Sequence, residues 1–346
     1  MPQRNIVVIG ASAGGVQALI QLVRGLPPDF LGAVFVVLHM GPSATSRLSE
    51  ILSRSGPLEA INATDGSPIE PGCIVIAPPD FHLVVRPGRV ELSRGPRENH
   101  TRPAIDPLFR SAARAYGNRV IGVVLSGALY DGTAGLLAIQ ARGGTTIVQD
   151  PQDAAVEGMP STALRLVDAD HVLPAAEIGP VLDRLTREPQ PEPGRATAMT
   201  EVDPLITGII QEDIHELAAN LRPHELTIYT CPDCGGTLWQ GQTGEWVSFH
   251  CHVGHAYAPE VLLGQKSEEL EAALWTCVRL LTEKATLTQQ LAARTAARGD
   301  TDIASRIAEQ ARLDEHYSQL IRDLVEASPN PISQSLVVAE ALGRSA

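Results

Sequence analysis

Residues 5–15 read NIVVIGASAGG, and this stretch decides the fold of the first half of the chain. The apolar run 6–9 leads into a glycine-rich turn, and the amphipathic stretch 16–24 follows at once. This order predicts a strand, a sharp turn and a helix. Because the apolar run is continuous rather than alternating, we expect it to be buried on both faces, as strands of parallel sheets are.

The same alternation of strand and helix continues to about residue 187. Further apolar runs rich in valine and isoleucine lie at residues 34–38, 74–77, 120–125 and 145–148. Helical stretches lie at residues 46–54, 107–116 and 133–142. The pattern predicts a doubly wound α/β fold, with a mostly parallel sheet covered by helices on both faces. Residues 82–92 carry Pro87-Gly88 between two alternating runs, which predicts a hairpin appended to that sheet.

The second half of the chain changes in character. After the first domain, 1–187, the segment 188–225 begins with a proline-rich linker (187–200) and contains a short predicted helix at 204–220. A small Cys/His-rich module follows at 226–258, and two helices at 259–297 and 301–327 are predicted to form a helical hairpin. Residues 328–346 are expected to be a disordered tail. Apolar residues recur mostly every three or four positions in the first helix, at Leu270, Leu274, Cys277, Leu281, Leu287 and Leu291.

Charge and hydropathy exclude some partners. The net charge is -13, and residues 1–187 contribute only -1 of it, so the second half is strongly acidic. Nucleic-acid binding needs positive charge, and we expect none. No apolar run is long enough to span a membrane, and the N-terminus does not resemble a secretory signal, so the expected location is the cytoplasm without membrane insertion.

The first turn has the pattern G-x-S-x-G at residues 10–14. In a strand–turn–helix setting this pattern can project the hydroxyl of Ser12 from the carboxyl end of the sheet. The flanking Ala13, Gly14 and Gly15 let the backbone turn, and the helix N-terminus can support an oxyanion. A phosphate-binding turn or a purely structural turn remains an alternative. The dinucleotide pattern G-x-G-x-x-G and the phosphate-loop pattern ending in G-K-[ST] are both absent.

A serine nucleophile needs a base and an orienting acceptor. His39 follows the predicted strand 34–38, and Asp131 follows the predicted strand 120–125. The carboxyl ends of parallel strands share one edge of the sheet. We therefore expect Ser12, His39 and Asp131 to meet there. Each alone also has an ordinary reading, as a structural histidine or a turn aspartate.

Six stretches in this half resemble one family, the chemotaxis methylesterases of the CheB type. They are IGASAGG (9–15), VVLHM (36–40), ENHTRPAIDPLFRSAA (98–113), GVVLSGALYDGTAGL (122–136), GGTTIVQD (143–150) and EGMP (157–160). The resemblance implies Ser12 as nucleophile, His39 as base and Asp131 as its orienting partner. It also implies hydrolysis of glutamyl methyl esters on chemoreceptor helices, deamidation of certain glutamines, and no catalytic cofactor. The implied partner is a methylated chemoreceptor or a similar helical signalling protein.

The chain departs from that family at three points. Ala13 replaces a usual threonine, and Ala128-Leu129 replaces a usual Met-Gly pair. The family usually carries an N-terminal receiver domain, and we expect none here because the first strand begins near residue 6. Arg102 is expected either to bind an acidic substrate or to be an ordinary surface residue. The alternative function is a docking module in a chemosensory pathway with weak or no catalysis.

The Cys/His module suggests a metal. Cys231 and Cys234 form a C-x2-C pair, and Cys251 and His255 form a C-x3-H pair. Four such ligands predict a closed, structural zinc site in a zinc-ribbon-like module. His252 is an alternative fourth ligand, and His250 a less favoured one. The helices that follow are expected to pack together or to associate with a second copy.

Overall fold

The computed structural model describes residues 5–41, 46–188, 225–243 and 246–327. The chain divides into two compact units, Met1–Pro259 and Glu260–Ala346. The predicted linker beyond residue 188, the predicted helix at 204–220 and the tail at 328–346 lie outside the described residues.

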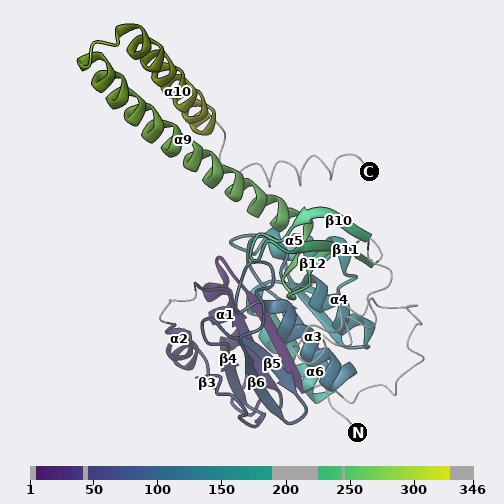
Figure 1. Cartoon of the computed structure of the whole chain (residues 1–346). Coiled ribbons are helices and arrows are strands. Elements are labelled where there is room, and N and C mark those ends of the chain that lie inside the picture. Colours follow the sequence, from purple (N-terminus) through teal and green to yellow (C-terminus); the bar gives the residue numbers. More distant parts are fainter. Residues whose placement is uncertain (1–4, 42–45, 189–224, 244–245, 328–346) are drawn as a thin grey trace. The chain divides into compact units, whose positions relative to one another are not determined.

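A seven-stranded sheet forms the centre of the first unit (Figure 1). Its order is β3-β4-β2-β1-β7-β8-β9, and all neighbouring strands are parallel. The strands are β1 (Ile6–Ala11), β2 (Ala33–Leu38), β3 (Glu59–Asn62), β4 (Cys73–Ile76), β7 (Val120–Val124), β8 (Thr145–Gln149) and β9 (His171–Leu173). Every residue of β1, β2 and β7 is buried, as their continuous apolar sequences predict. The short edge strands β3 and β9 were not predicted from the sequence.

Helices cover both faces of this sheet, which confirms the doubly wound α/β prediction. On one face, Val7 and Ile9 of β1 share a core with Leu19 of α1 and Leu182 of α6. On the other face, Gly10 and Gly122 leave room for side chains of α3 and α4. The helices are α1 (Gly15–Arg24), α2 (Leu48–Ser55), α3 (Ile105–Tyr116), α4 (Thr133–Ala141), α5 (Gly158–Leu166) and α6 (Ala175–Arg187).

The predicted hairpin forms, as β5 (His82–Arg86) and β6 (Arg89–Ser93), but it is not appended to the main sheet. It makes a separate two-stranded sheet that packs on α3. The backbone N–H of Val85 donates to Ser111 Oγ at 3.0 Å, and that of Gly88 donates to Tyr116 Oη at 2.8 Å. Polar side chains of α3 therefore hold the hairpin by hydrogen bonds to its backbone.

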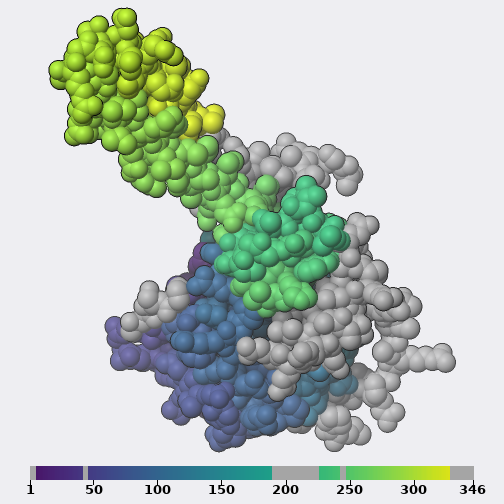
Figure 2. Space-filling model, in the orientation of Figure 1, coloured from purple at the N-terminus to yellow at the C-terminus, as the bar shows by residue number. Residues whose placement is uncertain are grey.

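A four-stranded antiparallel ribbon completes the first unit. It contains β10 (Glu225–Thr230), β11 (Thr237–Thr243), β12 (Trp246–Cys251) and β13 (Ala256–Tyr257). Leu238, Phe249 and Tyr257 are buried, whereas Ile228 is 94% exposed. So small an apolar core leaves the ribbon dependent on additional cross-links. In the space-filling view the green ribbon lies directly against blue residues of the sheet domain (Figure 2).

The second unit is a helical hairpin of α9 (Pro259–Ala297) and α10 (Thr301–Ala327), with the predicted bounds. Small residues line the contact between the two helices, including Ala285, Ala311 and Ser318. In the predicted apolar row, Leu274 and Leu281 are partly buried, whereas Leu270, Cys277, Leu287 and Leu291 are exposed. None of the described helices is long and apolar enough to cross a membrane.

Candidate active site and metal centre

Ser12 lies in the sharp turn between β1 and α1. Its backbone N–H donates to the carbonyl oxygen of Ser126 at 2.9 Å, and its own carbonyl accepts from the N–H of Gly15. Gly14 has a φ of 75°, in the left-handed region that favours glycine, and α1 begins at the next residue. The side chain of Ser12 is partly exposed. The turn thus presents a hydroxyl at the carboxyl edge of the sheet, as the G-x-S-x-G pattern predicts.

His39 leaves the neighbouring strand at the same level. Ala11 pairs with Leu38, and the N–H of His39 donates to the carbonyl oxygen of Ala11 at 3.1 Å. Ser12 and His39 therefore come directly after two residues, Ala11 and Leu38, that are paired on adjacent parallel strands. Parallel register alone brings these two side chains to one edge of the sheet.

Asp131 lies beneath His39 and is almost completely buried. Its Oδ2 accepts from His39 Nε2 at 2.6 Å and from the N–H of Ile105 at 2.7 Å. Its Oδ1 accepts from the N–H groups of Asp106 and Gly132, at 3.2 Å and 3.0 Å. This many donors around one carboxylate fixes its orientation and favours its ionised form.

The pKa values of two buried carboxyl groups at this edge are shifted in opposite directions. Burial opposes ionisation of Asp131, but the hydrogen bond and charge of His39 outweigh it, together with the backbone donors, and the pKa of Asp131 falls to about 2. Burial and the nearby charge of Asp131 raise the pKa of Asp106 well above its ordinary value. Neighbouring carboxyl groups avoid ionising together, and here the one bonded to His39 keeps the charge.

Three polar residues around this site were not singled out from the sequence. Asp106 Oδ1 accepts from the N–H groups of Gly132 and Gly135 and so caps α4. Asn99 Nδ2 donates to Asp131 Oδ1 at 3.2 Å. Ser126 Oγ donates to the carbonyl oxygen of Ala13 at 2.7 Å and supports the serine turn. Asn99 and Asp106 lie within the stretch 98–113 that carries the family resemblance, and that was the available signal.

The Ala128-Leu129 departure has a visible backbone consequence. Leu129 adopts a φ of 69°, in the left-handed region where the family usually has glycine. A bulky residue there is strained. Leu129 is two residues from Asp131, so the strain is stored in the loop that carries the carboxylate.

Arg102 is held by groups of the chain itself. Its Nε and Nη2 donate to Asp80 Oδ1, at 3.0 Å and 2.7 Å, and its Nη1 donates to the carbonyl oxygens of Arg94 and Gly95. With its donors directed inward, Arg102 braces the loop before α3. These contacts favour the reading as a structural arginine over a substrate-binding one.

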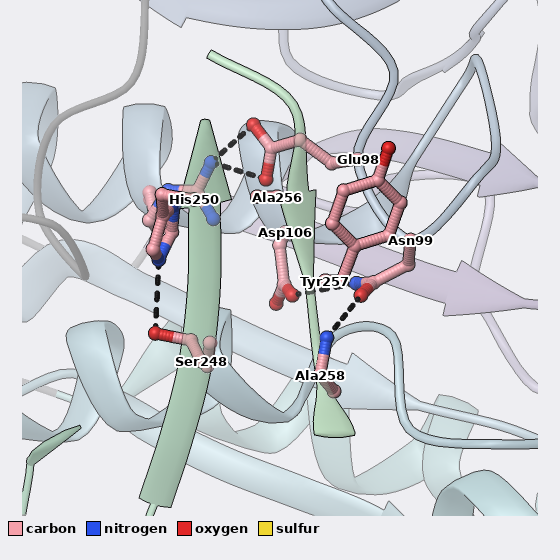
Figure 3. Close-up of a pocket in the computed structure, with 10 residues that line it drawn as sticks. Glu98, Asn99, Asp106, Ser248, His250, Ala256, Tyr257 and Ala258 are labelled. Atoms are coloured by element: carbon pink, nitrogen blue, oxygen red, sulfur yellow. Dashed lines mark hydrogen bonds and ion pairs between the residues drawn. The ribbon is translucent and has the colours of Figure 1, made fainter. Parts of the chain in front are cut away.

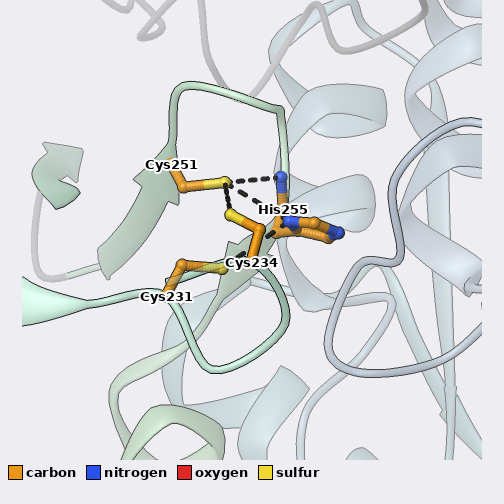
Figure 4. A group of neighbouring side chains, drawn as sticks. All are labelled: Cys231, Cys234, Cys251 and His255. Carbon is orange, nitrogen blue, oxygen red and sulfur yellow. Dashed lines mark hydrogen bonds between the residues drawn. The ribbon is translucent and has the colours of Figure 1, made fainter. Parts of the chain in front are cut away.

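Cys231, Cys234, Cys251 and His255 lie together at one end of the ribbon (Figure 4). Their ligand atoms all lie within 4.8 Å of one another. Cys234 Sγ is 3.7 Å from Cys251 Sγ, and His255 Nδ1 is 3.4 Å from Cys251 Sγ and 3.6 Å from Cys231 Sγ. Ligands of a tetrahedral zinc ion stand about 3.8 Å apart for two sulfurs and about 3.5 Å apart for sulfur and nitrogen. These three distances match tetrahedral zinc, and the four side chains could hold a metal ion.

The other two histidines of the module point elsewhere. His250 Nε2 is hydrogen-bonded to Ser248 Oγ at 2.9 Å. His252 is exposed, and its ring lies 5.6 Å from that of Trp239. Of the three candidates, His255 is the one that joins the cysteines.

Known proteins resemble the first half of this chain. A protein-glutamate methylesterase/protein-glutamine glutaminase 2 of Anaeromyxobacter dehalogenans is 44% identical over 183 residues, covering 53% of this chain and 54% of its own length. A relative of the same description from Caulobacter vibrioides is 40% identical over 181 residues. The chain spans about half the length of the curated relatives it matches.

A solved structure and a family profile cover the same region. The crystal structure of the Thermotoga maritima CheB methylesterase catalytic domain superimposes with a TM-score of 0.51 at 38% identity, covering 52% of this chain and 98% of that one. The profile described as CheB methylesterase matches residues 7–182, the region that carries Ser12, His39 and Asp131. The chain therefore belongs to the CheB methylesterase family.

Proposed function

We propose that residues 1–187 form a serine hydrolase that removes methyl esters from glutamate side chains of chemoreceptor-type proteins. Ser12 is the nucleophile, His39 the general base and Asp131 the group that orients His39. The observation that carries the proposal is the 2.6 Å hydrogen bond from His39 to the buried Asp131. That pair lies at the sheet edge from which the Ser12 turn also emerges.

The low pKa of Asp131 supports one arrangement of the protons in this scheme. Because Asp131 is ionised, it accepts the hydrogen bond, and Nε2 of His39 carries the shared proton. Nδ1 is then the nitrogen that takes the proton of Ser12 Oγ as that oxygen attacks the ester carbonyl. Asp131 stabilises the imidazolium that forms.

The reaction has two halves, formation and hydrolysis of an acyl-serine. Collapse of the tetrahedral intermediate breaks the bond to the methoxy oxygen, which leaves as methanol with the proton from His39. A water molecule, deprotonated by His39, attacks the acyl-serine and releases glutamate and Ser12. The same attack on a glutamine side chain would release ammonia, which is a deamidation. We propose that the backbone N–H groups of Ala13 and Gly14 support the oxyanion, whereas the N–H of Gly15 already donates to the carbonyl oxygen of Ser12 and supports the turn.

We further propose that Cys231, Cys234, Cys251 and His255 bind one structural zinc ion. Four protein ligands close a tetrahedral site, so the ion takes no part in the hydrolysis. Burial raises the pKa of the Cys251 thiol to about 12, and a bound cation would favour the thiolate, which is the form that binds a metal. The ribbon's small apolar core supports a structural role.

The hairpin is proposed to self-associate or to meet a helical partner. Exposed apolar residues recur at seven-residue spacing on α9, at Leu280 and Leu287 and at Leu263 and Leu270. Such rows suit helix–helix contact. Contact with a second copy would bury them without involving the hydrolase site.

Methanol release from a methylated receptor fragment tests the proposed activity. Ser12→Ala and His39→Ala should each lower the rate by ~10⁴-fold or more, and Asp131→Asn somewhat less, because nucleophile and base act as a unit. Ser55→Ala is the matched control, since the hydroxyl of Ser55 donates to the carbonyl oxygen of Ile51 within α2 and contacts none of the proposed catalytic residues. Serine-independent hydrolysis would refute the mechanism. Receptor binding without hydrolysis would instead favour the docking module.

A further inference from the structure

The ribbon joins the hydrolase domain through the backbone of Glu98 and Asn99. Glu98 forms a parallel bridge with Ala256 of β13. The N–H of Asn99 donates to the carbonyl oxygen of Ala256 at 2.9 Å. The N–H of Ala258, just after β13, donates to Asn99 Oδ1 at 3.4 Å. The loop that carries Asn99 is thus hydrogen-bonded along one side to the last strand of the ribbon.

The other end of the Asn99 side chain reaches the catalytic carboxylate. Its Nδ2 donates to Asp131 Oδ1 at 3.2 Å and lies 3.4 Å from Asp106 Oδ2. The two partners fix which way the amide points: the N–H of Ala258 needs an acceptor, and ionised Asp131 needs a donor. Asn99 itself has a φ of 48°, a conformation that asparagine tolerates better than most residues.

The contact between ribbon and domain is close (Figure 3). A cavity of about 30 Å³ is lined by Glu98, Asn99 and Arg110 of the domain and by His250 and Tyr257 of the ribbon. That volume admits one water molecule and no substrate. Glu98 is fixed in the interface by a buried ion pair with Arg110, at 2.6 Å and 2.7 Å. This surface is therefore a packed internal interface.

The Cys/His cluster also contacts this strand. β13 begins at the residue after His255. Tyr257 Oη donates to Asp233 Oδ2 at 2.7 Å and lies 3.1 Å from Cys231 Sγ. Asp233 lies between the two cysteines of the C-x2-C turn. A metal bound there would fix the strand whose backbone holds Asn99.

We propose that the metal-bound ribbon is a positioning element for Asp131, acting through Asn99. The ribbon fixes the Asn99 amide, the amide fixes Asp131, and Asp131 orients His39. A metal held by Cys231 and the later ligands, all at least 100 residues after Asp131 in the chain, thereby sets the geometry of the hydrolase site. This inference rests on the proposed methylesterase function. Asn99 touches no substrate in this scheme and is a positioning residue.

The test compares the full chain and its Asn99→Gly variant, each with zinc and after chelation. Glycine keeps the left-handed backbone and removes only the amide. A hydrogen bond to a charged group corresponds to a factor of about 10 to 100 in an equilibrium. Asn99→Gly should therefore lower kcat for methanol release by about 10-fold or more and leave KM nearly unchanged. Chelation should lower kcat of the unmodified chain similarly, zinc should restore it, and chelation of Asn99→Gly should add little.

A second readout does not depend on activity. Chelation should speed hydrogen exchange at the backbone amide of Asn99 and leave the amides of β1 and β7 unchanged. Asn99→Asp, which keeps the shape but places an acceptor against Asp131, should be slower than Asn99→Gly. His252→Ala, on the exposed face of the ribbon, is the control and should match the unmodified chain in both readouts.

The outcomes separate the two proposals. If chelation slows Asn99→Gly by the same factor as the unmodified chain, or if Asn99→Gly is fully active, the ribbon does not act through Asn99 and the inference fails. Unchanged exchange at Asn99 after zinc removal also overturns it. If the unmodified chain releases no methanol, or Ser12→Ala releases as much, the proposed function fails instead.

Discussion

At the residue scale, Asp131 carries a charge inside the protein, and that charge has a stability consequence. Its pKa is about 2 in the folded chain, below the ordinary aspartate value of about 3.9. A depressed pKa stabilises the fold above the unfolded value, and the stabilisation is lost as the pH falls through the folded value. For Asp131 the loss occurs between about pH 4 and pH 2.

We expect Asp131→Asn to lack this acid-dependent term, which is on the order of 2–3 kcal/mol. The free energy of unfolding in urea, measured from pH 2 to pH 7, should fall more steeply for the unmodified chain than for the variant below pH 4. The raised pKa of Asp106 acts with the opposite sign, and at pH values above that window. Parallel curves for the two proteins below pH 4 would contradict the assignment.

The backbone conformation of Leu129 is expected to lower the stability of the fold. A non-glycine residue in the left-handed region costs on the order of 1–3 kcal/mol, and this leucine is 46% exposed, so packing does not repay that cost. Leu129→Asn should raise the free energy of unfolding by about 1 kcal/mol, because asparagine tolerates this conformation. Leu129→Ala keeps the strained Cβ and is the control. Equal stability of the two variants would mean that the loop is not strained.

At the element scale, the ribbon combines short strands with a cluster of ligands. We expect one zinc ion per chain, retained through dialysis and measured by elemental analysis. Cys234→Ser should lose it, because three ligands no longer close the tetrahedron. Cys277→Ser is the matched control: Cys277 is exposed on α9, outside the cluster, and its replacement should leave the zinc content unchanged. Full occupancy in Cys234→Ser would refute the ligand assignment.

At the scale of the whole molecule, the exposed leucines of α9 lie in a unit of their own. We expect light scattering to show the full chain as a dimer or higher assembly. Leu280→Gln/Leu287→Gln should shift it toward the monomer, since glutamine keeps the helix and removes the apolar row. The variant should hydrolyse its substrate at the unmodified rate, because Ser12, His39 and Asp131 all lie in the other unit, Met1–Pro259. An unchanged mass would exclude this row as the contact.

The sequence by itself determined the features that depend on nearby residues or on a simple period. Continuous apolar runs predicted the central strands, and heptad-like spacing predicted the bounds of α9 and α10. The serine turn is a local pattern, and the spacing of Cys231, Cys234, Cys251 and His255 is set by two short chelating turns. In each case the residues that determine the feature lie within about forty positions of one another in the chain.

Only the tertiary structure decided which groups surround Asp131 and what the ribbon touches. Asn99 joins β13 to Asp131. The strand β13 lies more than 150 residues after Asn99 in the chain, and Asp131 lies about 30 residues after it, so no local pattern marks Asn99. The same holds for the hairpin, where three of the five leucines that predicted the contact are exposed. The buried residues of the hairpin include the small Ala285, Ala311 and Ser318, so the two helices approach closely there. Such choices depend on the shape of a distant partner surface, and that surface exists only once the chain has folded.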